Sequence, residues 1–184
     1  EKAGHTVHLI REPGGTVISE KIRDILLLKE HEEMSQETEL LLFAASRAQL
    51  VKEKILPALQ RNEIVISDRF HDSTYAYQGF GRGINLELIN MINNYAIGRA
   101  IPDITFFIDI TLEEIARRKS RIPGLELDRI ENSKSEFYEK VRAGFIKLSE
   151  TQLRVMLING QKEITDIHRE ILERIKELQI QEEK

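Results

Sequence analysis

The chain contains no cysteine, and this absence excludes disulfide bonds, zinc sites with thiolate ligands and thiol catalysis. It also lacks any apolar run near the roughly 20 residues that a bilayer-spanning helix requires. No excess of positive charge is present either, because 27 Lys and Arg against 31 Asp and Glu give a net charge of −4. This balance argues against a general nucleic-acid or membrane-surface binder, so an anionic ligand must be held by local arginines.

A length of 184 residues suits one well-packed domain, which we expect to span residues 1–184. A hydrophobic content of 41% with 32% charged residues is typical of a folded protein. The sequence opens Glu1-Lys2-Ala3-Gly4-His5, with neither an initiating Met nor an apolar signal region. We therefore expect a cytoplasmic protein, whose opening resembles the end of a helix as if a preceding segment were absent.

Apolar patterning predicts strands that alternate with helices along the whole chain. Short β-branched runs predict strands, at 6–10, 64–67, 103–110 and 153–158. Helical spacing and caps predict helices, at 17–28, 35–56 with Pro57 kinking it or starting another, 86–99, from 111 onward, 135–151 and 164–178. Gly79, Gly81 and Gly83 indicate a loop. The order predicts an α/β fold with a doubly wound parallel sheet flanked by helices.

The strand predicted at 64–67 ends directly in Asp68-Arg69. Ligands of open α/β sheets bind outside the carboxyl ends of the strands, so these charges lie where chemistry is expected. A carboxylate for a magnesium shell beside a guanidinium for phosphate oxygens suits a phosphate-and-magnesium site. The alternative is a structural ion pair between the two side chains.

A second charged strand end is Arg11-Glu12, which is followed by Pro13-Gly14-Gly15-Thr16. Glycines permit close approach of the backbone to a ligand, so the segment also fits a phosphoryl group and its metal. An ordinary turn is the alternative, because Pro-Gly is common in turns.

Phe43 and Arg47 lie four residues apart on a predicted helix and therefore share a face. One interpretation is an aromatic surface for a nucleobase, with the arginine donating to a base carbonyl. The alternative is an amphipathic core helix whose arginine reaches out to solvent.

Two further polar pairs follow Asp68-Arg69 at the same spacing, Ser73 with Tyr77 and Thr74 with Gln78. One helical turn can direct them toward a ligand, although caps and solvated side chains explain them equally well. The basic run Arg117-Arg118-Lys119-Ser120-Arg121 suggests a mobile lid over residues 117–130, or a solvated helix end favoured by the helix dipole. Arg117 and Arg121 would face the same way if the helix continued between them.

The order of these segments resembles the bacterial thymidylate kinase family over essentially the whole chain. The resemblance is carried by Arg11 to Thr16, the Phe43/Arg47 helix, Asp68-Arg69-Phe70 with Ser73 to Gly79, and Asp128-Arg129-Ile130-Glu131. It implies a P-loop nucleoside monophosphate kinase architecture and transfer of the γ-phosphoryl group of ATP to dTMP with Mg²⁺, giving dTDP and ADP for dTTP biosynthesis. It also implies a homodimer, with the apolar faces of the helix that contains Leu40 and of the helix over 86–97 as candidates. As the net charge indicates, we expect no nucleic-acid or membrane partner.

The resemblance also implies roles for single residues. On the acceptor side, Phe43 would stack on thymine, Arg47 would donate to a carbonyl, Ser73, Thr74 and Gln78 would line the base, and Tyr77 would contact the deoxyribose. Arg11 and Arg69 would hold the acceptor phosphate, and Asp68 would organise Mg²⁺ through water, with Glu12 nearby. On the donor side, Arg117 would lie along adenine and Arg121 would act on the transition state. Catalysis would then be alignment and charge neutralisation.

The sequence departs from the family because these 184 residues contain no Gly-x-x-x-x-Gly-Lys-Ser/Thr motif. The strand, loop and helix that carry it would occupy roughly 30 residues. We expect that strand between the strands ending at Arg11 and Asp68, in a full-length kinase of which this chain is a truncated form. The chain alone is expected to be inactive. Alternatives are a kinase for another nucleoside monophosphate and a catalytically dead relative that binds a nucleotide or a partner.

Overall fold

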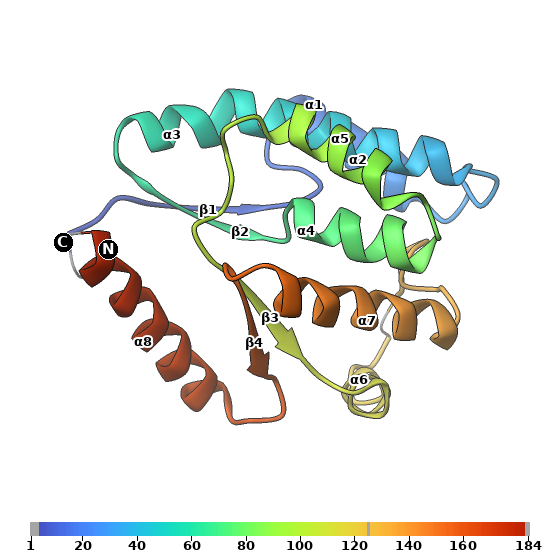
Figure 1. The fold of residues 1–184 in the computed structure, drawn as a ribbon. Helices are drawn as coiled ribbons and strands as arrows, with labels where there is room; N and C mark the ends of the chain where they lie inside the picture. Colours follow the sequence, from blue (N-terminus) through green and yellow to red (C-terminus); the bar gives the residue numbers. More distant parts are fainter. Residues whose placement is uncertain (1–3, 125, 183–184) are drawn as a thin grey trace. The chain divides into compact units, whose positions relative to one another are not determined.

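The computed structural model describes residues 4–124 and 126–182, and its elements alternate as the sequence predicts (Figure 1). The strands are β1 (Val7–Arg11), β2 (Ile64–Asp68), β3 (Thr105–Asp109) and β4 (Val155–Asn159). The α-helices are α1 (Val17–Leu27), α2 (Gln36–Leu50), α3 (Leu56–Gln60), α4 (His71–Thr74), α5 (Leu86–Ile97), α6 (Leu112–Lys119), α7 (Ser135–Thr151) and α8 (Ile164–Glu182). Two π-helical segments, η1 (Val51–Ile55) and η2 (Tyr75–Gly81), continue α2 and α4.

The strands form two parallel pairs, which confirms the predicted α/β class with parallel strands flanked by helices. β1 pairs with β2 from Val7 opposite Ile64 to Arg11 opposite Asp68. β3 pairs with β4 in the same sense. The expectation that another strand lies between the strands ending at Arg11 and Asp68 is wrong, because the facing edges of β1 and β2 already bond to each other.

The chain divides into two compact units. The first combines Glu1–Ile101 with Glu126–Phe145, and the second combines Pro102–Leu125 with Ile146–Lys184. The single domain over 1–184 stays a prediction. The predicted lid at 117–130 belongs partly to each unit, and its residue 125 lies outside the described residues.

In the first unit, α1, α2 and α5 lie side by side over one side of the β1–β2 pair (Figure 1). One core cluster joins the helices to the strands, with Leu50, Val51, Ile55 and Ala100 buried against Ile10, Leu56, Val65 and Phe70. A second cluster buries Ala76, Ile130, Phe137 and Val141, with Phe43 and Tyr77 packed against it. Burial of this apolar surface holds α2 and η2 where their polar side chains meet.

The predicted helix over 35–56 begins as expected, because the Ser35 hydroxyl accepts a hydrogen bond from the backbone N–H of Thr38 at 3.1 Å. It continues through η1 into the short helix α3, which carries Pro57 at its start. A proline removes one backbone donor, and a π-helical turn is one way in which a helix accommodates the lost bond. Pro57 therefore lies in a new α-helical segment, α3, but the chain stays helical from α2 through η1 to α3 without a break.

The loop expected around Gly79 and Gly81 is wrong, because residues 71–81 are helical through α4 and η2. A Cβ atom at Gly79 would lie 2.6 Å from Leu86, and one at Gly81 would lie 2.5 Å from Phe137. These glycines therefore serve close packing of the helix rather than a turn. Gly83 does adopt a positive φ of 78°, just after the helix ends.

The second unit contains the β3–β4 pair, α6, α8 and the end of α7. The Thr111 hydroxyl caps α6 by accepting a hydrogen bond from the N–H of Glu114, as predicted. Gly160 follows β4 so closely packed that a Cβ atom there would lie 2.6 Å from Ile110. None of the helices in the described ranges combines the length and the apolar character that crossing a membrane demands.

Candidate active site

Arg11 and Asp68 end the two paired strands of the first unit and lie opposite each other in the register. The chain stays paired one residue further, because the N–H of Glu12 donates to the carbonyl of Asp68 at 3.0 Å. Both side chains are exposed. The two charged strand ends that the sequence indicates therefore lie next to each other at the carboxyl ends of paired strands.

Arg69 follows β2 with a φ of 66°, in the left-handed region that is uncommon for a residue with a side chain. Its guanidinium lies over the ring of Tyr77, 5.0 Å from the centroid. Burial would lower the pKa of Arg69, but Tyr77 and the charge of Asp68 together raise it. Asp68 and Arg69 therefore attract each other, although within residues 4–124 and 126–182 their side chains do not form an ion pair.

The segment from Arg11 to Thr16 is held by the first two turns of α1. Glu20 accepts from the N–H of Gly15 at 2.6 Å and from Arg11 Nη2 at 3.0 Å. The Gly15 bond is the main cause that lowers the pKa of Glu20 below its ordinary value. Gly15 adopts a φ of 90°, and a Cβ atom there would lie 2.8 Å from Leu50 of α2. The turn is therefore a specific close contact between β1, α1 and α2.

Arg23, which no sequence motif singles out, adds a third cation to this edge of the first unit. Its Nη1 donates to the carbonyl of Pro13 at 2.8 Å. Burial lowers the pKa of Arg23, and the like charges of Arg11 and Arg69 lower it further, so the three guanidinium groups influence one another. The charges of Glu20 and Asp128 oppose that shift, so the cluster contains both signs of charge, with guanidinium groups that an anion such as phosphate can contact.

Arg47 is buried rather than solvated, with only 2% of its surface exposed. The interpretation that its side chain reaches solvent is therefore wrong. Nε and Nη2 lie 2.7 Å from Glu12 Oε2, and Nη1 donates to Thr74 at 2.9 Å and to Asn93 at 3.2 Å. The remaining contact, from Nη2 to the carbonyl of Phe70, is the longest at 3.4 Å. Arg47 thus connects α2 to the β1 end, to α4 and to α5.

Glu12 has a less complete environment than Arg47. Its Oε2 receives both contacts from Arg47, whereas its buried Oε1 has no hydrogen-bond partner among the residues that the structure describes. Burial raises the pKa of Glu12 above the ordinary 4.5, and the charge of Arg47 opposes that shift. A buried carboxylate oxygen without a donor is costly, which identifies Oε1 as a place for a ligand group or water.

The residues predicted to surround a base come from two neighbouring helical runs. Phe43 of α2 and Tyr77 of η2 pack against the same core cluster. Thr74 and Gln78 are 1% and 2% exposed, so they share the buried face, while Ser73 and Tyr77 are half-buried. The interpretation of the Thr74/Gln78 pair as solvated is therefore wrong.

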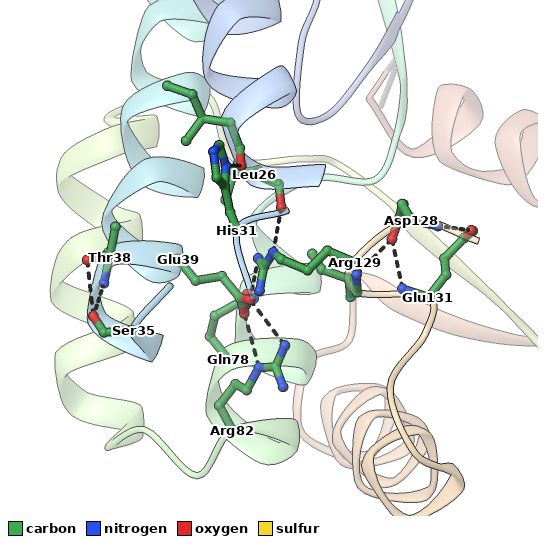
Figure 2. A network of polar contacts seen from close by, with 12 residues as sticks. Leu26, His31, Ser35, Thr38, Glu39, Gln78, Arg82, Asp128, Arg129 and Glu131 are labelled. Atoms are coloured by element: carbon green, nitrogen blue, oxygen red, sulfur yellow. Dashed lines mark hydrogen bonds and ion pairs between the residues drawn. The ribbon is translucent and has the colours of Figure 1, made fainter. Parts of the chain in front are cut away.

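Glu39 is a buried carboxylate that the sequence analysis missed, and Figure 2 shows the network around it. Gln78 Nε2 donates to Oε1 at 2.9 Å, Arg82 contacts both oxygens at 3.2 and 3.1 Å, and Arg129 Nη2 donates to Oε2 at 2.7 Å. Burial would raise the pKa of Glu39, but the hydrogen bonds and charges of these partners together hold it below 4.5. Glu39 is thus held in its ionised form.

The same network explains the segment Asp128-Arg129-Ile130-Glu131. Arg129 Nε donates to the carbonyl of Leu26 at 2.8 Å, and its backbone N–H donates to the carbonyl of Leu27. The Asp128 carboxylate accepts from the N–H groups of Ile130 and Glu131 at 2.9 and 2.7 Å (Figure 2). The segment is therefore an anchor that fastens residues 128–131 to the end of α1 and the start of α2.

The two lid arginines belong to the second unit, and both are exposed. Arg117 pairs with Glu114 through two contacts of 2.6 and 2.7 Å and lines a hollow of about 380 Å³ with Thr111, Glu113 and Gln161. α6 ends at Lys119. The condition that would align Arg117 with Arg121, a helix continuing between them, is therefore not met.

Metal ligands are sparse in the described part of the chain, where no group of three or more His, Asp or Glu side chains could hold an ion. Asp68 nevertheless fits Mg²⁺, which keeps several waters and needs only one or two carboxylates when substrate phosphates supply other oxygens. Its exposed side chain at the end of β2 leaves room for such a water shell.

Comparisons with known proteins identify the family of the chain. Residues 1–171 match the family model described as Thymidylate kinase. The chain is 46% identical over 176 residues to the thymidylate kinase of Thermoanaerobacter sp. (strain X514), covering 95% of this chain and 85% of that protein. It is 44% identical over 178 residues to that of Caldanaerobacter subterraneus subsp. tengcongensis, covering 96% and 84%. A crystal structure of thymidylate kinase from Ehrlichia chaffeensis superimposes with a TM-score of 0.72 at 34% identity, covering 92% of this chain and 80% of that one.

Proposed function

The chain belongs to the thymidylate kinase family, and from that membership we propose that it binds dTMP as acceptor of the γ-phosphoryl group of ATP, giving dTDP and ADP for dTTP biosynthesis. The observation that carries the proposal is the pairing of Arg11 with Asp68 at the ends of adjacent parallel strands. It joins guanidinium and carboxylate groups at the edge where α/β sheets bind ligands. Arg23 and Arg69 add positive charge there.

The base would occupy the region between α2 and η2. We assign stacking on thymine to Phe43 and contacts with the base to Ser73, Thr74 and Gln78. Tyr77 would lie against the deoxyribose. Arg47 would donate to a thymine carbonyl by giving up its longest contact, the 3.4 Å bond from Nη2 to Phe70.

The phosphate of dTMP would be held by Arg11 and Arg69. Arg11 is paired with Glu20 at an exposed site, and a doubly charged phosphate competes well with a solvated carboxylate for a guanidinium. Mg²⁺ held through water by Asp68 would neutralise charge on the phosphates. No strong base is required, because the acceptor is an ionised phosphate. Catalysis would therefore come from alignment of the reactants and neutralisation of the phosphate charge.

Donor residues belong to the second unit in this proposal. Arg117 would lie along adenine, which suits the hollow that it lines with Thr111, Glu113 and Gln161. Arg121 would act on the transition state. The homodimer, the cytoplasmic location and the lid at 117–130 stay predictions.

Calorimetric titration of the 184-residue chain with dTMP, dUMP, dGMP and dCMP tests the acceptor half directly. We expect dTMP to bind most tightly. Preference for another nucleotide would indicate a kinase for a different nucleoside monophosphate, and binding of none of them would overturn the proposal.

ATP turnover is a separate measurement, because these residues contain no Gly-x-x-x-x-Gly-Lys-Ser/Thr. We expect inefficient phosphorylation of dTMP by a chain whose mass shows that it starts at Glu1. Efficient turnover by that chain would contradict the expectation while leaving the dTMP assignment intact. Persistent binding without turnover in a longer chain that carries the motif would instead favour a catalytically dead relative.

A further inference from the structure

Thr74 and Gln78 are four residues apart in one helical run, and each is bonded to a buried charged side chain. Arg47 Nη1 donates to the Thr74 hydroxyl oxygen at 2.9 Å. Gln78 Nε2 donates to Glu39 Oε1 at 2.9 Å (Figure 2). Thr74 is 1% exposed and Gln78 is 2% exposed, so water does not compete freely for either contact.

The charged partners determine which atoms of Thr74 and Gln78 donate hydrogen bonds and which accept them. A guanidinium can only donate, so the Thr74 oxygen accepts from Arg47 and its own hydrogen is left to donate. An ionised carboxylate can only accept, so the amide nitrogen of Gln78 faces Glu39 and the carbonyl oxygen is left to accept. The pair therefore offers one donor and one acceptor in a fixed sense.

Glu39 is arranged to stay ionised. Arg82 contacts both of its oxygens, and Arg129 contacts Oε2 at 2.7 Å with a side chain that is only 9% exposed. Arg129 is in turn fastened to the carbonyl of Leu26 at 2.8 Å. Two guanidinium groups on one carboxylate leave it no proton to donate, so the sense of the Gln78 amide cannot reverse.

We propose that Glu39 is a positioning residue that sets base selectivity through Gln78, by holding its carbonyl toward the base. This inference rests on the proposed function. A thymine or uracil edge presents a carbonyl beside an N3–H, which matches a donor and an acceptor. Cytosine presents an amino group beside a bare N3, the opposite pattern, and leaves two buried groups of the protein mismatched. Glu39 thereby acts against cytosine without contacting it.

The test compares Glu39→Gln with Arg82→Met by calorimetric titration of each with dTMP, dUMP and dCMP. A glutamine at 39 can donate as well as accept, so the Gln78 amide can turn over. We expect the ratio of dTMP to dCMP affinity to fall about tenfold or more. The ratio of dTMP to dUMP should stay unchanged, because these bases differ at the 5-methyl group and share the hydrogen-bonding edge.

Arg82→Met is the matched control, because it breaks two contacts of the same network and leaves the Glu39–Gln78 bond. We expect lower thermal stability with the dTMP to dCMP ratio of the unmodified chain. An equal fall in that ratio for Arg82→Met would overturn the positioning role and indicate general loosening. An unchanged ratio in folded Glu39→Gln would overturn it as well.

A charge-balanced pair covers the case in which Glu39→Gln does not fold. Glu39→Gln with Arg82→Met removes one charge of each sign, and comparison with Arg82→Met alone isolates the carboxylate. The expected fall in the dTMP to dCMP ratio is the same, and its absence would overturn the proposal. Failure of the unmodified chain to bind dTMP would instead contradict the proposed function.

Discussion

Glu12 and Glu39 are two carboxylates buried in the same unit, 5% and 1% exposed, yet their surroundings differ in the number of donors. Glu12 receives donors from Arg47 on one oxygen, and Oε1 has no partner within the described residues. Glu39 receives donors on both oxygens from Arg82, with Gln78 and Arg129 adding one each. Their pKa values shift in opposite directions, up for Glu12 and down for Glu39.

Burial alone does not set the charge of a carboxylate. Desolvation raises the pKa in both cases, and the number of guanidinium and amide donors decides whether it is outweighed. A carboxylate with all lone pairs engaged serves as a structural hub. One with an unpartnered oxygen retains capacity for a ligand, which suits Glu12 at the strand end beside Asp68.

The largest expected effect is that of removing the single cation beside Glu12. Arg47→Met leaves the buried Glu12 without any counter-charge, so we expect the free energy of unfolding to fall by about 3–5 kcal/mol. Urea denaturation measures it. The double variant with Glu12→Gln should recover part of that loss, because two neutral groups replace an uncompensated charge. No recovery would mean that Arg47 acts through its contacts with Thr74 and Asn93 instead.

Removing one of the two cations that contact Glu39 should lower the free energy of unfolding by less than Arg47→Met does. Arg129→Met leaves Arg82 and Gln78 on the carboxylate, so we expect a loss of about 1–3 kcal/mol in the same denaturation experiment. Arg82→Met should cost less still, because its side chain is 21% exposed against 9% for Arg129. If Arg129→Met lowered the free energy of unfolding more than Arg47→Met does, a carboxylate with two cations would not be less sensitive to the loss of one than a carboxylate with a single cation.

The smallest effect is a difference in pH dependence. Because the pKa of Glu39 is lowered, its ionised form stabilises the fold above pH 4.5, and that contribution is lost as the pH falls further. The pKa of Glu12 is raised, so stability declines as the pH rises from 4.5 through the folded-state value.

Unfolding free energies from about pH 3 to about pH 7 should therefore separate the two residues. Glu39→Gln should reduce the loss of stability as the pH falls below 4.5. Glu12→Gln should reduce the loss of stability as the pH rises above 4.5. Each change in slope stays below the limit for one proton, about 1.4 kcal/mol per pH unit. Slopes that move in the same direction for both variants would show that the two carboxylates do not differ as described.

Much of the fold was predictable from local patterns. The spacing of apolar residues predicts the strands β1, β2, β3 and β4 and the long helices of the described residues, because each period reflects one buried face. Residues 71–81 were misjudged as partly loop, since three glycines nearby usually indicate turns. Gly79 and Gly81 are instead needed for tertiary packing, because a larger side chain at either position would collide with Leu86 or Phe137.

The sequence predicts those parts of the candidate site in which a charged residue ends a strand, as Arg11 and Asp68 do. The sequence patterns do not indicate the roles of Glu39, Arg82 and Arg23. For Glu39 the reason is its position in the first turn of a helix, where an acidic residue is common. Its spacing of four residues from Phe43 puts Glu39 on the face shared by Phe43 and Arg47, unlike Glu37, which is exposed, but this spacing does not identify the partners of Glu39. Its partners lie 39 to 90 residues away along the chain, so only packing reveals them.

Local sequence patterns are enough to predict the α/β class, the strand ends that carry Arg11 and Asp68, and the shared face of Phe43 and Arg47. These features depend on periods of two and about 3.6 residues, which the order of residues states directly. Three further features follow only from long-range packing: β1 pairs with β2, Arg47 is buried, and Glu39 forms ion pairs with two arginines. Those outcomes depend on which distant donors reach a desolvated carboxylate, and that is settled only when the helices pack.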